Sequence, residues 1–97
     1  MTTAPTYRRV LSRGATAKRW RDATRVVRDV RYTGARLTLV LDAQRVREQH
    51  FSSAVRDGDW RIEWAHWQAP ALEGAARRSE YSGDTVTITL ADVREAA

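Results

Sequence analysis

The sequence predicts an α+β fold, in which a small antiparallel sheet is covered on one face by a single helix. Two observations lead to this prediction. Residues 37–42 and 85–93 alternate their side chains with a period of two, which is typical of half-buried strands. Residues 43–56 favour a helix, and the chain of 97 residues is long enough for one modest core. We expect a basic N-terminal arm over residues 1–22 and one α+β domain over residues 23–97.

The charge distribution distinguishes the arm from the rest of the chain. Residues 1–36 contain ten basic and two acidic side chains, a net charge of +8. Residues 37–97 contain seven basic and ten acidic side chains, a net charge of −3. Residues 1–6 are small and polar, and we expect residues 7–22 to be a flexible basic segment with a short helix around residues 15–21.

Residues 23–42 predict a β-hairpin. Three apolar side chains on its first arm have the same parity: Val26, Val30 and Tyr32. On its second arm leucines alternate with other residues, and β-branched residues favour a pleated surface. Thr33 and Gly34 supply the turn, because glycine tolerates the positive φ that tight turns need.

A helix over residues 16–31 is the alternative interpretation of the same stretch. Its apolar stripe would contain Trp20, Ala23, Val27 and Val30. Three arginines would then line an adjoining face suited to a groove or a phosphate backbone: Arg21, Arg25 and Arg28. Gly34 would end this helix. We favour the strand over residues 24–32.

The predicted helix of the domain covers residues 43–56. Asp42 is the expected N-cap, since a carboxylate there accepts a hydrogen bond from a free backbone N–H. Asp57 and Gly58 are expected to end the helix, with Gly58 in the left-handed conformation.

The remaining residues predict a strand, a long loop and a final strand. Residues 60–67 are rich in aromatic side chains and favour a strand; a helix stopped by Pro70 is the alternative. Residues 69–84 are polar and contain glycine, and we expect them to form a loop. Residues 85–93 form the last predicted strand.

Four tryptophans are many for a chain of this size. Trp60 and Trp64 are expected to anchor the core, because large aromatic side chains dominate small cores. Trp20 and Trp67 are the candidates for exposure. An exposed Trp20 could stack on a nucleic-acid base while neighbouring cations hold phosphates, as in proteins that bind single strands. The same residue types also dominate protein–protein interfaces.

The residue types that usually carry catalysis or bind metals and cofactors argue against all three functions in this chain. There is no cysteine, so disulfides and thiolate ligands are excluded. His50 and His66 are the two histidines, each near a glutamate, but a zinc site needs three or four converging ligands. The five glycines are scattered, so no nucleotide-binding loop is present. No nucleophile, base and electrophile occur together, and we expect no catalytic activity.

The composition also suggests where such a protein occurs. No apolar run approaches the ~20 residues that span a bilayer, and no signal peptide follows the start. We therefore expect a soluble cytoplasmic protein without membrane contact. Sixteen arginines against one lysine, with abundant alanine, are typical of a bacterial chromosome, phage or plasmid rich in G and C.

Two functional hypotheses follow from the charge. The first is a small basic nucleic-acid-binding module, an accessory or regulatory protein that acts through phosphate contacts with little sequence preference. Trp20 or Tyr7 would stack on bases. The predicted binding residues are Arg8, Arg9, Arg13, Lys18, Arg19, Trp20, Arg21, Arg25 and Arg28.

The second hypothesis is a protein–protein interaction module, such as an adaptor, subunit or inhibitor. Its basic arm would dock on an acidic protein partner or on the acidic body of a neighbour in a homo-oligomer. The two hypotheses differ in one structural expectation. If the arm folds back onto the acidic residues of its own chain, we expect the nucleic-acid hypothesis to fail.

Overall fold

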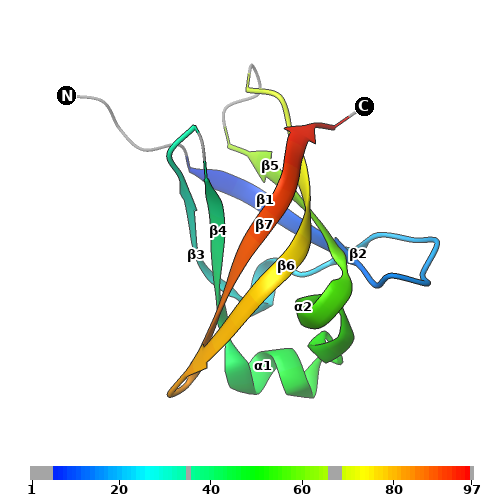
Figure 1. Cartoon of the computed structure of the whole chain (residues 1–97), viewed down its shortest axis with the longest axis vertical. Coiled ribbons are helices and arrows are strands. Elements are labelled where there is room, and N and C mark those ends of the chain that lie inside the picture. Colours follow the sequence, from blue (N-terminus) through cyan, green and yellow to red (C-terminus); the bar gives the residue numbers. More distant parts are fainter. Residues whose placement is uncertain (1–5, 35, 66–68, 97) are drawn as a thin grey trace.

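Strands account for most of the structure. The computed structural model describes residues 6–34, 36–65 and 69–96, which form one seven-stranded antiparallel sheet and two short helices (Figure 1). The predicted α+β fold with one packed helix is therefore wrong. It failed because two segments that were expected to be an arm and a loop are long strands of the sheet.

The elements can be followed along the chain in Figure 1. The strands are β1 (Tyr7–Arg13), β2 (Arg21–Asp22), β3 (Val27–Tyr32), β4 (Leu37–Asp42), β5 (Asp59–Trp64), β6 (Leu72–Ser82) and β7 (Thr85–Glu95). The helices are α1 (Ala43–Glu48) and α2 (Ser52–Asp57), and a single 3-10 turn, η1, covers Thr24–Val26. Across the sheet the order is β2-β1-β5-β6-β7-β4-β3.

The sheet curls until β3, at one edge, meets β1 near the other edge. The Tyr7 hydroxyl on β1 donates to the Val27 carbonyl on β3 at 3.5 Å, and the Val10 N–H on β1 donates to Thr24 Oγ1 of η1, the turn that leads into β3, at 3.0 Å. Farther along, the rings of Tyr32 and Trp64 stack with their centroids 5.8 Å apart. These contacts enclose the apolar side chains on the inner face, and α1 and α2 lie together toward one end of the curled sheet (Figure 1).

Alternation along the strands supplies the core. Trp60 is fully buried and Trp64 is 7% exposed, which confirms the prediction that they anchor the core. The Trp60 indole N–H donates to the Ala54 carbonyl at 3.0 Å, so its polar atom is satisfied inside the protein. The predicted strand over residues 60–67 is confirmed as β5; His66 and Trp67 lie outside the described residues.

The predicted hairpin is confirmed, but its first strand begins at Val27 and not at residue 24, because Thr24–Val26 form η1. β3 and β4 pair antiparallel from Val27 opposite Leu41 to Tyr32 opposite Leu37, and Gly34 has a φ of 90°. The alternative helix over residues 16–31 is wrong, because only the single turn η1 is helical in that stretch.

The predicted helix over residues 43–56 is two helices. Asp42 caps α1 as expected, its carboxylate accepting from the Arg45 N–H at 3.1 Å. The chain then breaks at His50, which has a φ of 61°. Gly58 ends α2 with a φ of −86°, so the expected left-handed conformation is wrong.

Residues 69–84 were expected to form a loop, but Leu72–Ser82 form β6. The segment looks polar because its outer face is charged, while small residues such as Gly74 and Ala76 lie on the buried face. β5 pairs with its first part, and β7, which follows after a turn at Gly83 and Asp84, pairs with its whole length. β7 confirms the final predicted strand and extends it to Glu95.

The N-terminal basic segment is part of the sheet. Residues 7–13 form β1 between β2 and β5, and no helix occurs over residues 15–21. Val10 and Ser12 on β1 are buried, so this strand contributes to the core as well as to the surface. Among the residues described, no helix has the length and apolar character needed to cross a membrane.

Candidate nucleic-acid interface

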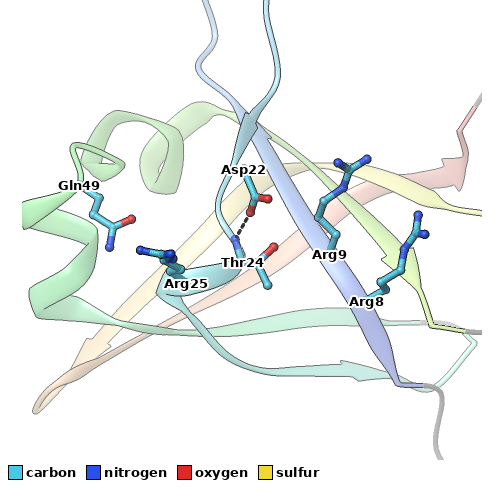
Figure 2. A pocket seen from close by; sticks show the side chains of 6 residues that line it. All are labelled: Arg8, Arg9, Asp22, Thr24, Arg25 and Gln49. Carbon is cyan, nitrogen blue, oxygen red and sulfur yellow. Dashed lines mark hydrogen bonds between the residues drawn. The ribbon is translucent and has the colours of Figure 1, made fainter.

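An open groove lies where β1, η1 and the end of α1 meet. Its volume is about 800 Å³. We call it the basic groove and define it by its lining residues: Arg8, Arg9, Asp22, Thr24, Arg25 and Gln49. Figure 2 shows Arg25 and Gln49 on one side of Thr24, with Arg8 and Arg9 on the other. Three arginines thus share the groove with a single carboxylate.

A β-bulge explains how the successive residues Arg8 and Arg9 can both lie on the exposed face of β1. Side chains normally alternate between the faces of a strand. The register between β1 and β5 shifts between Tyr7 and Arg9, so Tyr7 is opposite Trp64 and Arg9 is opposite Glu63. This extra residue lets Arg8 and Arg9 both reach the exposed side of the strand.

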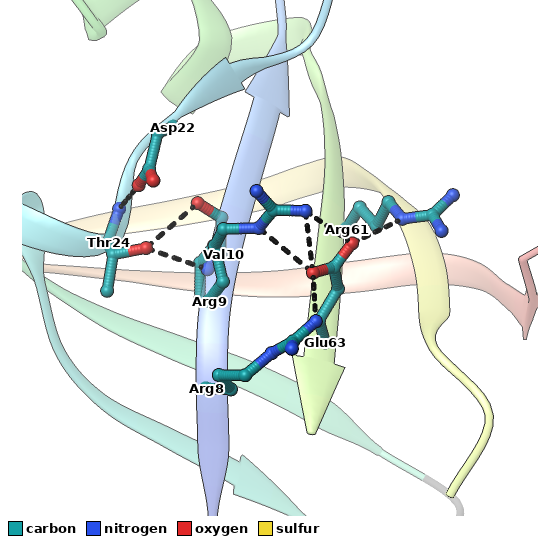
Figure 3. Close-up of polar contacts among 7 residues, drawn as sticks. All are labelled: Arg8, Arg9, Val10, Asp22, Thr24, Arg61 and Glu63. Carbon is teal, nitrogen blue, oxygen red and sulfur yellow. Dashed lines mark hydrogen bonds and ion pairs between the residues drawn. The ribbon is translucent and has the colours of Figure 1, made fainter. Parts of the chain in front are cut away.

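Glu63 on β5 holds both arginines (Figure 3). Its carboxylate accepts from Arg8 Nη2 at 3.0 Å and from Arg9 Nε at 2.9 Å, and Arg61 Nε lies 3.4 Å away. Partial burial acts to raise the pKa of Glu63, but the hydrogen bonds from Arg9 and Arg8 outweigh it and lower the pKa below its ordinary value. Three guanidinium groups therefore share an ionised carboxylate and retain an excess of positive charge.

Asp22 and Thr24 form the floor between the arginines. The Thr24 N–H donates to Asp22 Oδ1 at 2.8 Å, while Thr24 Oγ1 accepts from the Val10 N–H. Hydrogen bonds from the side chain and the backbone of Thr24 lower the pKa of Asp22, so the carboxylate is ionised at neutral pH. Asp22 thus reduces the positive charge of the groove without cancelling it.

Two further arginines border the groove through its lining residues. Arg45 on α1 donates to the Arg25 carbonyl at 3.0 Å, and Arg21 donates to the Gln49 carbonyl at 2.8 Å. Arg25 itself is exposed and forms no ion pair with the residues described. Of the arginines lining the groove, Arg25 is the one whose guanidinium is available without breaking an existing ion pair.

Several of the other predicted binding residues are engaged elsewhere. Arg13 pairs with Asp59 at 3.2 Å and lies over the Trp20 ring at 4.5 Å. Arg28 bridges Asp42 at 3.0 Å and Asp84 at 3.1 Å. These pairs join the basic part of the chain to its acidic part.

Arg21 contacts the segment that joins α1 to α2. Besides its bond to Gln49 it donates to the His50 carbonyl at 3.1 Å, and its guanidinium lies 4.2 Å from the centre of the Phe51 ring. It therefore braces the chain between α1 and α2. His50 lies between α1 and α2, at the point where the predicted single helix breaks.

The loop between β1 and β2 carries the last three predicted residues. Lys18 and Arg19 are exposed, and Trp20 is half-buried. Within the described part of the chain, neither Lys18 nor Arg19 takes part in an ion pair. This loop and the basic groove lie at different ends of β1 (Figure 1), so the structure does not gather all nine residues in one site.

Sequence reasoning missed the polar residues that complete the groove. Asp22, Thr24 and Gln49 line it, and Glu63 orients Arg8 and Arg9. Only the spacing of Asp22 and Thr24 carried a local signal, since Asp side chains often accept from the backbone two residues onward. Gln49 and Glu63 are far away in the chain, and no local pattern places Gln49 in the groove or Glu63 beside Arg9.

No residues in the described ranges suggest a metal centre, because no three His, Asp or Glu side chains cluster there.

Comparisons of the chain with family models, with curated proteins and with solved structures found no match.

Proposed function

We propose that this protein is a small nucleic-acid-binding module that contacts phosphates through the basic groove. The observation that carries the proposal is the convergence of Arg8, Arg9 and Arg25 on one open groove with a single acidic residue, Asp22. Guanidinium groups bind phosphate oxygens with two parallel hydrogen bonds. The groove is open rather than enclosed, which suits a polymer that continues beyond it.

The proposed surface is smaller than the nine residues expected from the sequence. Arg13 and Arg28 are paired with carboxylates of their own chain, and Arg21 donates to backbone carbonyls. Arg8 and Arg9 both pair with Glu63, so their guanidinium groups would have to contact Glu63 and a phosphate at the same time. We therefore assign the leading contact to Arg25, with Lys18 and Arg19 as a separate, secondary contact.

A protein-interaction module is the second candidate, and one observation favours it. Much of the basic segment lies against acidic residues of the same chain, through the pairs of Arg9 with Glu63, Arg13 with Asp59 and Arg28 with Asp42. This arrangement withdraws those cations from nucleic acid, as expected if the basic segment folds back on its own chain. Among the described residues, Lys18, Arg19 and Arg25 are the predicted cations that form neither such a pair nor a side-chain hydrogen bond to a backbone carbonyl, and the nucleic-acid proposal depends on them. For the second candidate, the same groove would receive a carboxylate-rich segment of a partner protein.

Fluorescence anisotropy with labelled single-stranded DNA, duplex DNA and RNA at several salt concentrations tests the proposal. We expect the logarithm of affinity to fall linearly with the logarithm of salt concentration, as it does when phosphates are neutralised. Arg25→Gln should weaken binding to all sequences and reduce the slope on duplex DNA by about 0.9, the value of one phosphate contact.

Arg56→Gln is the matched control. It removes the same charge from an exposed side chain on α2, outside the basic groove. We expect it to leave the salt slope unchanged. No binding at low salt would refute the nucleic-acid proposal and favour the acidic protein partner. Equal effects of both substitutions would show that net charge, and not the groove, drives binding.

A further inference from the structure

We propose that this protein forms a symmetric dimer in which the free edge of β6 pairs antiparallel with β6 of a second copy. The proposal concerns a different surface from the basic groove and does not depend on nucleic-acid binding. It rests on an open strand edge, on the charges along that edge, and on one exposed tyrosine.

The far half of β6 has a strand partner on one side only. β7 pairs with β6 as far as Ser82, whereas β5 pairs only with Leu72–Ala75. The last backbone hydrogen bond on the β5 side joins the Ala76 N–H to the Gly58 carbonyl at 2.9 Å. Figure 1 shows this part of the β6–β7 hairpin running away from β5 to its tip. Such an edge is a template for another strand.

The opposite edge of the sheet is closed by its own side chains. On β3 the Asp29 carboxylate accepts from the Val30 N–H at 2.9 Å, and the Tyr7 hydroxyl donates to the Val27 carbonyl at 3.5 Å. β2 contains only two residues. Among the described strands, residues 78–82 of β6 therefore form the edge best suited to strand addition.

The charges on β6 favour one register. In a two-fold antiparallel pair, each residue lies opposite a residue of the same face, so the axis passes through one residue. An axis at Ser79 places Arg78 opposite Glu80 of the second copy, and the reverse pair forms by symmetry. An axis at Arg78 or Glu80 would place like charges directly opposite each other, which is unfavourable.

The side chains that would form these pairs are accessible. Arg78 is 77% exposed and Glu80 is 66% exposed, and within one chain they contact each other at 3.2 Å. Charged residues on an edge strand usually oppose strand addition. Here opposite charges two residues apart make the edge complementary to itself.

Tyr81 supplies the apolar part of the interface. It is 57% exposed, and among the described residues it is the one large hydrophobic side chain that lies mostly in solvent. Tyr81 lies opposite Val86 and Ser79 opposite Ile88, so Tyr81 and Ser79 share one face of β6. An axis at Ser79 therefore places Tyr81 diagonally beside Ser79 of the second copy, on the same face of the joined sheets. The dimer would cover a tyrosine that the single chain leaves in water.

Sedimentation velocity over a range of protein concentrations, without nucleic acid, tests the dimer. We expect a reversible monomer–dimer equilibrium in the wild-type protein. Arg78→Glu and Glu80→Arg should each weaken dimerisation about tenfold, because each places two pairs of like charges opposite each other. The double variant Arg78→Glu/Glu80→Arg should restore dimerisation, since it reverses both charges together.

Arg31→Glu is the control, because it makes the same charge change as Arg78→Glu at an ion-paired arginine on β3 and keeps the Asp29 carboxylate that accepts from the Val30 N–H. It should leave dimerisation unchanged, and circular dichroism should show that all variants are folded. Hydrogen exchange gives a second readout: amides of residues 78–82 should become more protected as concentration rises. A monomer at every concentration, or a double charge reversal that fails to restore the dimer, would refute the proposal.

Discussion

Gly58 lies so close to α2 that there is no room for a Cβ atom at this position. A Cβ at this position would lie 2.7 Å from Ala54 Cα and 2.8 Å from the Ala54 carbonyl oxygen. Both are backbone atoms of α2, so they cannot move aside as a flexible side chain can. The glycine is required for close approach at the start of β5, and not for the left-handed conformation expected from the sequence.

We predict that Gly58→Ala destabilises the protein by about 1–3 kcal/mol, the usual cost of forcing extra volume into a packed region. The free energy of unfolding in urea measures the effect. Gly14→Ala is the control, because no atom lies within 4 Å of its would-be Cβ. It should change stability by less than about 0.5 kcal/mol. Equal effects would contradict the steric explanation.

At the scale of elements, Asp42 joins β4, α1 and the basic segment. Its Oδ1 accepts from the Arg45 N–H and caps α1, and its Oδ2 accepts from Arg28 at 3.0 Å. One side chain therefore ends a strand, begins a helix and holds β3 in place.

We predict that Asp42→Ala lowers the urea midpoint of unfolding more than Asp42→Asn does. Asparagine retains an oxygen that can cap the helix but loses the charge that pairs with Arg28. Alanine loses both functions. A midpoint that is equal in the two variants would show that the ion pair, and not the cap, carries the contribution of Asp42.

At the scale of the whole molecule, ion pairs connect the basic and acidic parts of the chain. The chain carries a net charge of +5, yet Arg8, Arg9, Arg13 and Arg28 all pair with carboxylates of residues 37–97. The pairing keeps the first strand on the sheet and leaves the positive excess around the basic groove.

This arrangement predicts loss of stability in acid. The pKa of Asp84 is lowered by hydrogen bonds from Arg28, and that of Asp42 by the Arg45 N–H and then by Arg28. The pKa values of Asp22 and Glu63 are lowered as described above. Because a lowered pKa favours the folded state only while the carboxylate is ionised, stability should be full above about pH 5 and decline toward pH 2.

Urea unfolding at a series of pH values measures this decline. Glu63→Gln should reduce the dependence on pH, since one of the titrating carboxylates is removed. A stability that is constant between about pH 5 and pH 3 would contradict the assignment of these ion pairs.

Much of the local structure could be predicted from the sequence, because its causes are local. Alternation along residues 37–42 predicted β4, and Asp42 was recognised as a cap from its position before a helical segment. The burial of Trp60 and Trp64 follows from their parity on one strand. In each case the signal and its structural consequence lie within a few residues of each other.

The tertiary structure alone decided the fold class and the composition of the basic groove. β1 is a strand because a distant partner, β5, satisfies its backbone, whereas β6 forms a hairpin with the neighbouring β7. The polar outer faces of β1 and β6 made them resemble an arm and a loop. The bulge at Arg8 and the approach of Gln49 and Glu63 likewise depend on residues far away in the chain. By itself the sequence determined which segments alternate, where α1 starts and where positive charge is concentrated. Which cations remain free depended on which strands lie side by side, because the pairing of β1 with β5 and of β3 with β4 brings Arg9, Arg13 and Arg28 to their carboxylates.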